Sequence, residues 1–486
     1  MNANAYDAIV IGPGAGGAAC AYRLVHGGLR VVMLEKGTYL PTDGSTLDVE
    51  RVVTRGEFLS HEPWSDAHGR PLTPEEHFNV GGKTKWYGAA LMRMAQREFE
   101  PDAPYGCAGW PLGLADLAPY YAEAEELLGV RTFDCEPDLA RILARAAPQA
   151  SHWRREAMPM GLAADIAAHR NEAAHFDGFA SAQGLKNEAQ RSLLARLADA
   201  PNFTLLTNAE VTALLAAAAS STFDAVRLRD GRTFAAPRIF LAAGALHSPR
   251  LLARSLEANR PNASLPRAPL VGAHLKLHLL TAMVSIGTRP INDLIRKTVL
   301  LTSERFKHSS AQPLGFGADI IKSLLPKFVP AFLARALARR AYGFFLLTED
   351  SSDLRNRVED GSQSSAALPV LDYDQARMPQ AHAEHRAFTH ALRLALLGAG
   401  FLSFTQRVGL NGTAHACGTL ICGRDASDSV VDVDGRVHGA QGLYVVDGSV
   451  LARSSRVNPS LTIYAWGLRI GALVAEEFAR APQPSR

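Results

Sequence analysis

Cysteine is scarce in this sequence, and the few cysteines present are not paired. The 486 residues include five, and an odd, sparse set in a long chain does not make a disulfide framework. Cys417 and Cys422 stand five residues apart, with no second Cys or His pair nearby to complete a zinc site. We therefore expect reduced cysteines without a catalytic role, and no metal centre.

An excess of one charge and an export signal are lacking as well. Lys and Arg total 51 against 48 Asp and Glu, a formal net charge of +3, so there is no surplus of cations to neutralise a nucleic-acid backbone. The first apolar run, Ala8 to Gly12, follows a short polar leader and continues directly into a glycine motif, unlike a signal peptide. We expect a cytoplasmic protein that does not bind nucleic acid.

The N-terminal segment has the pattern of a dinucleotide-binding unit. Residues 6–11 form a β-branched run typical of a buried parallel strand, residues 18–26 favour a helix of small residues, and residues 29–34 favour a second strand. A G-x-G-x-x-G motif separates the first strand from the helix. Its glycines permit a tight turn, close approach of the backbone to a pyrophosphate, and close helix–strand packing. They are Gly12, Gly14 and Gly17.

Glu35 ends the second strand, 23 residues after Gly12. A carboxylate at this point accepts hydrogen bonds from both ribose hydroxyls and repels a 2′-phosphate, which disfavours NADP. The helix N-terminus meets the pyrophosphate with free N–H groups and the positive end of its dipole. The unit therefore predicts dinucleotide binding, but by itself it does not decide between FAD and NAD.

The rest of the chain shows two kinds of sequence pattern. With 47% hydrophobic and 20% charged residues it has the composition of an ordinary globular protein, and its length favours two lobes. Strand-like runs recur up to about residue 245, and residues from about 280 to 410 lack a glycine fingerprint. Glycine-rich segments that alternate with strands and a helix return after Thr413. We predict a discontinuous cofactor domain, 1–280 and 411–486, interrupted by a substrate domain at 281–410.

Three further blocks accompany the glycine fingerprint. Residues 80–93 contain a Gly-Gly-x-Thr segment, residues 243–252 contain a second glycine signature, and residues 415–462 contain a series of spaced elements. Together these blocks resemble the glucose–methanol–choline (GMC) oxidoreductase family over most of the chain. The 80–93 block and Trp110-Pro111, with residues 117–121, are similar to its sugar-oxidising, gluconate-type bacterial branch.

The resemblance implies both fold and cofactor. The fold would be α/β, with a Rossmann-like, discontinuous FAD-binding domain, loop or lid regions at about 40–80 and 130–180, and an inserted α+β substrate domain on an antiparallel sheet. Because Lys85 to Tyr87 include no histidine, we expect non-covalent FAD. Beyond the fingerprint and Glu35, the residues expected to bind FAD are Gly81, Gly82, Thr84, Gly88, Val211, Ala243, Gly244, Asp447, Gly448, Pro459 and Thr462.

The same resemblance implies the chemistry. Flavin N5 would accept a hydride, while His415, whose unperturbed pKa of roughly 6.5 suits a base, would take the hydroxyl proton. Asn458 resembles the second member of the family's His–His or His–Asn pair, and its amide can donate a hydrogen bond to the substrate oxygen. A helix N-cap is the other interpretation of Asn458, and the two roles are compatible.

Other polar residues have less specific patterns. We interpret His274 and His278 as packing residues with backbone hydrogen bonds, and His438 as structural. Glu349 either faces the substrate or lies in a solvated loop. The segment from Ile321 to Leu347 is too charged to span a bilayer. It predicts a basic amphipathic helix packed on its own domain, with contact to a membrane surface or closure over an apolar substrate as alternatives.

The predicted function is oxidation of a CH–OH group of a sugar or another alcohol. One alternative is a redox-neutral lyase or decarboxylase, suggested by Cys417 and Cys422 near His415. Another is a flavin-binding protein without turnover. The sequence leaves open the substrate, the oligomeric state, and whether oxygen, a quinone or a carrier protein accepts the electrons.

Overall fold

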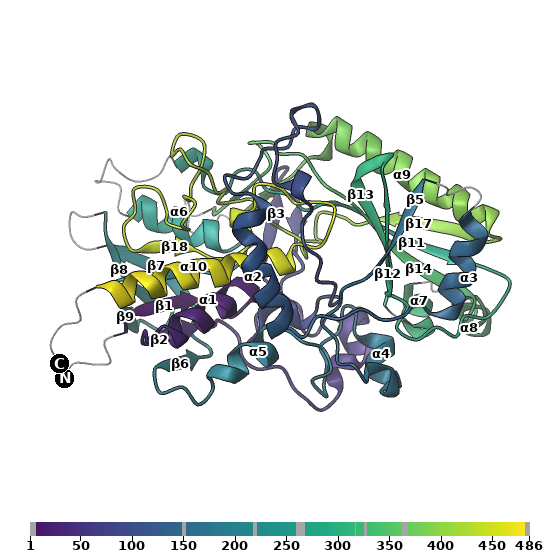
Figure 1. Cartoon of the computed structure of the whole chain (residues 1–486), viewed down its shortest axis with the longest axis horizontal. Coiled ribbons are helices and arrows are strands. Elements are labelled where there is room, and N and C mark those ends of the chain that lie inside the picture. Colours follow the sequence, from purple (N-terminus) through teal and green to yellow (C-terminus); the bar gives the residue numbers. More distant parts are fainter. Residues whose placement is uncertain are drawn as a thin grey trace.

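A parallel sheet forms the centre of one lobe (Figure 1). The computed structural model describes residues 6–147, 152–216, 221–258, 268–315, 317–324, 328–361 and 368–481. Within them, five strands pair in the order β18-β10-β1-β2-β6, all parallel. Their bounds are β1 (Ala8–Ile11), β2 (Val31–Leu34), β6 (Phe203–Leu206), β10 (Ile239–Leu241) and β18 (Leu443–Val445).

Four of the five strands in this sheet are fully buried. Every residue of β1, β2, β10 and β18 is buried, which explains why these strands are continuous apolar runs rather than alternating ones. Since β18 pairs with β10, the chain beyond residue 411 returns to the sheet in which it began.

Three helices pack beside one another on this lobe (Figure 1). They are α1 (Ala15–His26), α2 (Leu114–Leu127) and α10 (Ser460–Arg480). Helices α1 and α10 approach closely because glycines meet: a Cβ on Gly467 would lie 2.4 Å from the carbonyl oxygen of Gly16. The hydroxyls of Tyr121 on α2 and Thr462 on α10 lie 2.7 Å apart.

An antiparallel sheet forms the other lobe. Its order is β17-β11-β14-β13-β12-β5, with β5 contributed from outside residues 281–410. The strands are β5 (Trp153–Ala157), β11 (Leu279–Ile286), β12 (Val299–Ser303), β13 (Phe306–Pro313), β14 (Ala341–Thr348) and β17 (Leu402–Arg407). Helices α3 (Pro137–Ala146) and α9 (Pro379–Gly398) share a hydrophobic core with this sheet. Parallel and antiparallel sheets together confirm the predicted fold class.

Two smaller sheets and several short helices complete the described structure. One sheet joins β7 (Val211–Ala216), β8 (Phe223–Leu228) and β9 (Thr233–Ala235). The other has the order β15-β16-β3-β4, with β3 (Trp64–Asp66), β4 (Pro71–Leu72), β15 (Arg357–Glu359) and β16 (Val370–Asp372). The short helices include α4 (Arg170–His175), α5 (Ala189–Ser192) and α6 (Ser248–Ala258).

The segment from Ile321 to Leu347 is not one amphipathic helix, so that prediction is wrong. It contains the end of α7 (Ala318–Leu324), then α8 (Ala331–Ala338), and then most of β14; residues 325–327 lie outside the described residues. Its apolar residues do not form one continuous face. Ile321 and Ala338 pack against Ala341 of the sheet, whereas Phe328 and Phe332 are exposed.

Candidate active site

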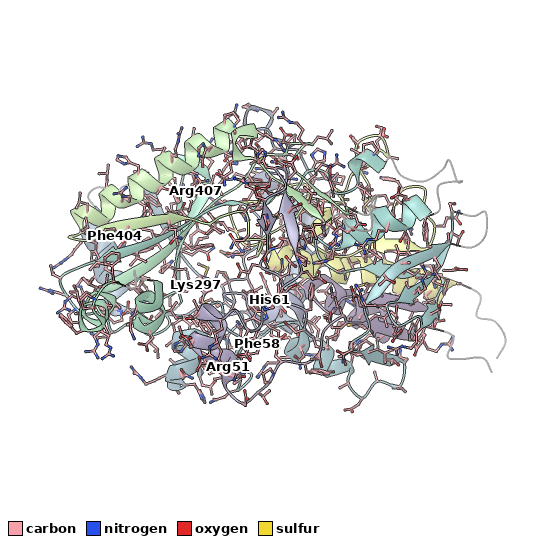
Figure 2. All side chains as sticks on the ribbon, turned by 180° about the vertical axis from the view of Figure 1, so that it is seen from behind. Arg51, Phe58, His61, Lys297, Phe404 and Arg407 are labelled. Carbon is pink, nitrogen blue, oxygen red and sulfur yellow. The ribbon has the colours of Figure 1, made fainter. Side chains whose placement is uncertain are left out.

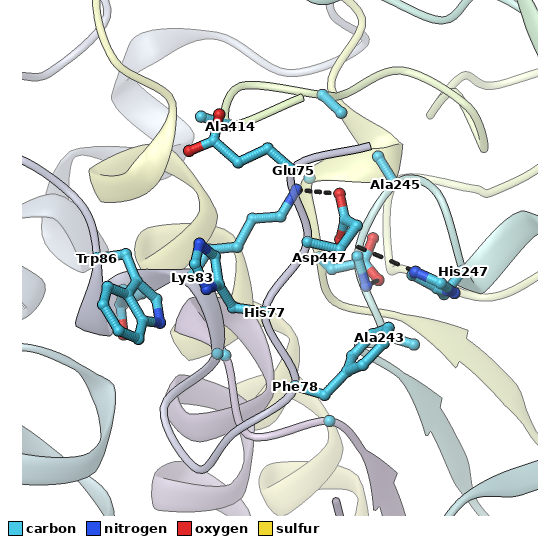
Figure 3. A pocket seen from close by; sticks show the side chains of 18 of the residues that line it. Glu75, His77, Phe78, Lys83, Trp86, Ala243, Ala245, His247, Ala414 and Asp447 are labelled. Atoms are coloured by element: carbon cyan, nitrogen blue, oxygen red, sulfur yellow. Dashed lines mark hydrogen bonds and ion pairs between the residues drawn. The ribbon is translucent and has the colours of Figure 1, made fainter. Parts of the chain in front are cut away.

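A cavity of about 1060 Å³ runs between the two lobes. Its walls include the glycine fingerprint after β1, the segment 75–90, the turn after β10, and residues of β11 and β14. In the view of Figure 3, Lys83 lies between Trp86 and Asp447, and Ala243 and Ala245 follow along the turn after β10. Segments far apart in the sequence therefore enclose one continuous space.

Most of the residues predicted from sequence line this cavity. They are Gly12, Gly14, Glu35, Gly82, Thr84, Gly88, Val211, Ala243, Gly244, His415, Asp447, Gly448, Asn458 and Pro459. Gly17, Gly81 and Thr462 are not among the lining residues. Gly17 serves packing, since a Cβ there would lie 2.0 Å from the Gly12 carbonyl oxygen.

The glycines of the fingerprint have different surroundings. Gly12 has φ +105°, and a Cβ on it would lie 2.4 Å from the Ala242 carbonyl oxygen. A Cβ on Gly14 would meet no atom within 4 Å, so Gly14 leaves open space in the cavity wall. Sequence reasoning missed Gly16, where a Cβ would lie 1.5 Å from the Val446 carbonyl oxygen. Gly16 allows α1 to approach the end of β18.

Two carboxylates are buried at the end of the cavity that the parallel sheet forms. Burial raises the pKa of Glu35 to about 7, although Gly37 donates its backbone N–H to Oε1 at 2.6 Å. Burial also raises the pKa of Asp447, which accepts hydrogen bonds from the Gly244 N–H at 2.8 Å and from the Ser248 hydroxyl. Asp447 thus joins the turn after β10 to the turn after β18, and the two strand ends form one wall.

His415 and Asn458 meet where the cavity borders the antiparallel sheet. Nε2 of His415 lies 3.1 Å from Nδ2 of Asn458. The side-chain oxygen of Asn458 accepts a hydrogen bond from Nε2 of Gln312 on β13, which sets the orientation of the amide. Helix α10 begins at Ser460 with no side-chain cap, so Asn458 is directed into the cavity rather than onto the helix terminus.

A second histidine orients His415. Nε2 of His278 lies 2.9 and 2.8 Å from the carbonyl oxygens of Ser454 and Ser455, so it must carry a proton. Nδ1 of His278 is then an acceptor, and Nδ1 of His415, 3.1 Å away, is its donor. The pattern assigns an unprotonated Nε2 to His415. The predicted backbone hydrogen bonds of His278 are present, but its contact with His415 was missed because 137 residues separate the two.

The electrostatic surroundings keep His415 neutral. Burial lowers its pKa well below the ordinary value, and the positive charges of Lys297 and Lys83 lower it further. Both lysines line the cavity. Lys83 pairs with Glu76 and donates to the Thr413 carbonyl oxygen at 2.9 Å, and Lys297 pairs with Asp177. Neither lysine was singled out from sequence, because the contact of Lys297 with Asp177 and that of Lys83 with Thr413 join residues far apart in the chain.

Glu349 neither faces the substrate nor lies in a solvated loop, and both readings of it are wrong. It is fully buried, with Arg453 donating to both of its oxygens. Nδ1 of His308 lies 2.9 Å from Oε2, and these contacts lower the pKa of Glu349 to about 2. Paired in this way, Glu349 ties β14 to the segment before α10.

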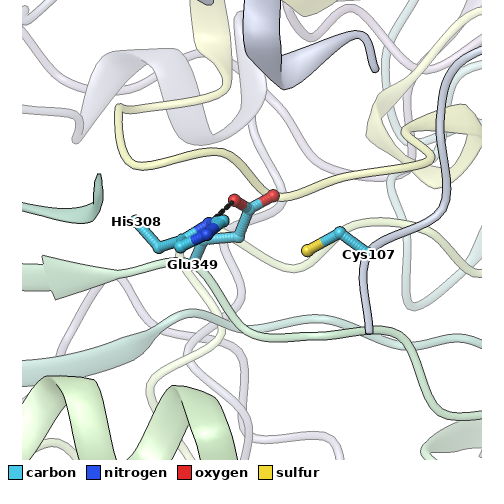
Figure 4. Close-up of side chains that lie close together, drawn as sticks. All are labelled: Cys107, His308 and Glu349. Atoms are coloured by element: carbon cyan, nitrogen blue, oxygen red, sulfur yellow. Dashed lines mark hydrogen bonds and ion pairs between the residues drawn. The ribbon is translucent and has the colours of Figure 1, made fainter. Parts of the chain in front are cut away.

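Cys107 lies beside Glu349 and His308 (Figure 4). Their ligand-type atoms are within 4.8 Å of one another. The nitrogens of His308, however, face the carboxylates of Glu349 and Asp102, and burial raises the pKa of the Cys107 thiol above its ordinary value. A cation would have to displace Arg453 from Glu349, so we interpret the group as a structural ion-pair network.

The remaining singled-out histidines lie outside the cavity wall. Nδ1 of His274 lies 2.8 Å from the Ser352 hydroxyl, a side-chain contact rather than the predicted backbone one. Nε2 of His438 lies 3.0 Å from the Ser429 hydroxyl. Within the described residues, no helix is long and apolar enough to cross a membrane.

Comparison with known proteins identifies the family. The GMC oxidoreductase model matches residues 44–280 with its N-terminal part and residues 354–467 with its C-terminal part. An FAD binding domain model matches residues 7–45. The chain therefore belongs to the GMC oxidoreductase family, and it is an FAD-dependent oxidoreductase that acts on alcohol groups.

Individual relatives span nearly the whole chain. The chain is 31% identical to 6'''-hydroxyparomomycin C oxidase of Streptomyces lividus, over 98% of its own length and 92% of the relative. It is 28% identical to paromamine 6'-oxidase of Streptomyces fradiae, over 97% and 91%. The crystal structure of pyridoxine 4-oxidase from Mesorbium loti superimposes with a TM-score of 0.69 at 17% identity, over 99% and 100% of the two chains, and shows the same fold.

Proposed function

We propose that this enzyme oxidises a sugar or another alcohol by hydride transfer to non-covalently bound FAD, with His415 as the general base. The observation that carries the proposal is the 3.1 Å contact between Nε2 of His415 and Nδ2 of Asn458 in the wall of the FAD cavity. One atom accepts a proton and the other donates a hydrogen bond. An alcohol oxygen that contacts both nitrogens, in place of their contact with each other, meets both groups that its oxidation requires.

The cavity residues fit FAD. The open space at Gly14 and the N-terminus of α1 suit a pyrophosphate, and the buried Glu35 suits a ribose. When bound, FAD supplies the hydride acceptor. Residues 83–88 contain no histidine, which supports non-covalent binding. Acid precipitation tests this point, since non-covalent flavin remains in the supernatant.

Residues of this chain position and accept the proton of the substrate hydroxyl. His278 holds the proton of His415 on Nδ1, so that the lone pair of Nε2, which faces Nδ2 of Asn458 in the structure, can take the proton of the substrate hydroxyl. Asn458, oriented by Gln312, donates to the substrate oxygen as negative charge develops on it. The low pKa of His415 keeps the base unprotonated at neutral pH.

The names of the relatives support an alcohol as substrate. One is an oxidase of a hydroxyparomomycin and another is a paromamine 6'-oxidase, and we extend the alcohol class, but no particular compound, to this chain. Oxygen, a quinone or a carrier protein would then reoxidise the flavin.

The test is an anaerobic absorbance scan of the purified enzyme with a panel of sugars and alcohols. We expect the oxidised-flavin band to bleach with at least one of them, and to bleach about 10²–10⁴-fold more slowly in His415→Ala. Admitting air then separates an oxidase from a dehydrogenase. A bound flavin that dithionite reduces but no panel member bleaches would contradict alcohol oxidation and favour a redox-neutral reaction.

A further inference from the structure

An ion pair lies in the wall of the cavity that also contains the proposed base. Nζ of Lys297 is 2.8 Å from Oδ2 of Asp177, and both residues line the cavity. Their side chains are 5% and 13% exposed. The Gly315 N–H also donates to Oδ2 at 3.1 Å. Figure 2 shows Lys297 between Phe404 of the antiparallel sheet and His61 of the other lobe.

Gly88 makes room for this pair. A Cβ on Gly88 would lie 2.2 Å from Nζ of Lys297 and 2.2 Å from Oδ1 of Asp177. Any other residue would therefore push the pair away from the 80–93 segment. The pair connects the region before β12 to the flavin-binding block, and its two residues line the same cavity as His415.

The pair has unused hydrogen-bonding capacity. An ammonium group has three donors, and the contact with Asp177 uses one of those on Lys297. Within the described residues, Oδ1 of Asp177 accepts no hydrogen bond, since both contacts to this carboxylate go to Oδ2. The neighbouring cavity walls from the antiparallel lobe include Leu280, Leu314 and Phe345. The pair thus offers a donor and an acceptor beside apolar walls.

We propose that Lys297 and Asp177 form a subsite for a second hydroxyl group of the substrate, while His415 acts on the first. A hydroxyl accepts one hydrogen bond and donates another, so it can accept from Nζ and donate to Oδ1. A simple alcohol would cover the pair without satisfying it, and a buried polar group left without a partner is costly. The subsite rests on the proposed function, and it selects diols and sugars over monohydric alcohols of equal size.

The experiment compares compounds of matched size on the holoenzyme. Flavin reduction is followed anaerobically by stopped flow with 1-butanol, the 1,2-, 1,3- and 1,4-butanediols, cyclohexanol and hexoses, and each series gives a dissociation constant and a limiting rate. We expect polyols to exceed monohydric alcohols by roughly 10-fold or more in rate over dissociation constant, because hydrogen bonds to charged groups discriminate by that much. Lys297→Met and Asp177→Asn should each reduce this ratio toward one.

Lys83→Met is the matched control, because Lys83 is the other lysine that pairs with a carboxylate in this cavity and lowers the pKa of His415. It should change the rates for polyols and monohydric alcohols by the same factor. An equal effect of Lys297→Met on both classes would overturn the subsite, as would a wild-type enzyme that prefers monohydric alcohols. If no compound reduces a flavin that dithionite does reduce, the proposed function itself fails.

Discussion

Nδ1 of His278 lies 3.1 Å from Nδ1 of His415, and the other ring nitrogen of His278 is held by two backbone carbonyl oxygens. These contacts can be satisfied together when His278 is protonated on Nε2 and His415 on Nδ1. His278 has φ +65°, a left-handed conformation that is uncommon for residues other than glycine. The backbone thus places the imidazole of His278 where it accepts the Nδ1 proton of His415. Nε2 of His415 is then left unprotonated and can accept a proton from the substrate.

Replacing His278 should weaken the base without removing it. In His278→Leu we expect flavin reduction to slow by up to about 10²–10⁴-fold, because His415 can then carry its proton on Nε2. His278→Asn should restore much of the rate, because its oxygen replaces Nδ1 as acceptor and Asn tolerates a positive φ. Equal rates in both variants would contradict a positioning role.

Direct changes to the base pair should separate its two members. Asn458→Ala removes a hydrogen-bond donor and should slow flavin reduction by about 10²–10³-fold, while leaving the acid limb below 6.5. With His415 intact and its pKa lowered, the wild-type rate should stay constant as pH falls from 8 to about 6.5. FAD content, measured from the visible spectrum, should match wild type in Asn458→Ala. An acid limb above pH 7 in the wild type would contradict His415 as the base.

The parts of the site that could be predicted from sequence are those that depend on local backbone geometry. Gly12 and Glu35 belong to one β-α-β unit, whose spacing alone indicates a dinucleotide site. The contacts of His278, Lys297 and Glu349 depend on residues more than 100 positions away, and no spacing rule predicts them. The segment 321–347 shows the same limit, since its last residues form β14, which pairs with β11 and β13 from elsewhere in the chain.

Breaking the Glu349–Arg453 pair should destabilise the protein strongly. Arg453 is 2% exposed and Glu349 is fully buried, so Glu349→Gln would leave a buried guanidinium without its counter-charge, at a cost of about 3–5 kcal/mol in the free energy of unfolding. The lowered pKa, about 2, means that the ionised pair stabilises the wild type above the ordinary pKa of about 4.3. That stabilisation is lost as pH falls toward 2. Urea unfolding of both proteins measures the difference, and a loss below 1 kcal/mol would contradict this role.

Two alanine substitutions in the fingerprint should affect different properties, one the stability of the fold and the other the binding of FAD. Gly16→Ala places a Cβ against the Val446 carbonyl oxygen, and we expect a loss of roughly 1–3 kcal/mol or more in the free energy of unfolding. Gly14→Ala meets no atom within 4 Å, so it should keep wild-type stability while its methyl group weakens FAD binding. Thermal unfolding of the apoproteins and FAD titration distinguish the two effects. A destabilised Gly14→Ala apoprotein would show that the loop does not have this open space.

The affinity for FAD should depend on pH through Glu35. Burial raises the pKa of this carboxyl to about 7, whereas acceptance of two ribose hydrogen bonds requires the ionised form. Binding must therefore release a proton below pH 7, and the dissociation constant should rise by up to about tenfold for each pH unit below it, with little change above. Titration of the apoprotein by quenching of FAD fluorescence between pH 5.5 and about 8.5 measures this slope.

Glu35→Gln should bind FAD more weakly at pH 8 and show no such slope, because its amide does not titrate and has a single acceptor oxygen. If the slope persists in Glu35→Gln, another group releases the proton and Glu35 is not the ribose ligand.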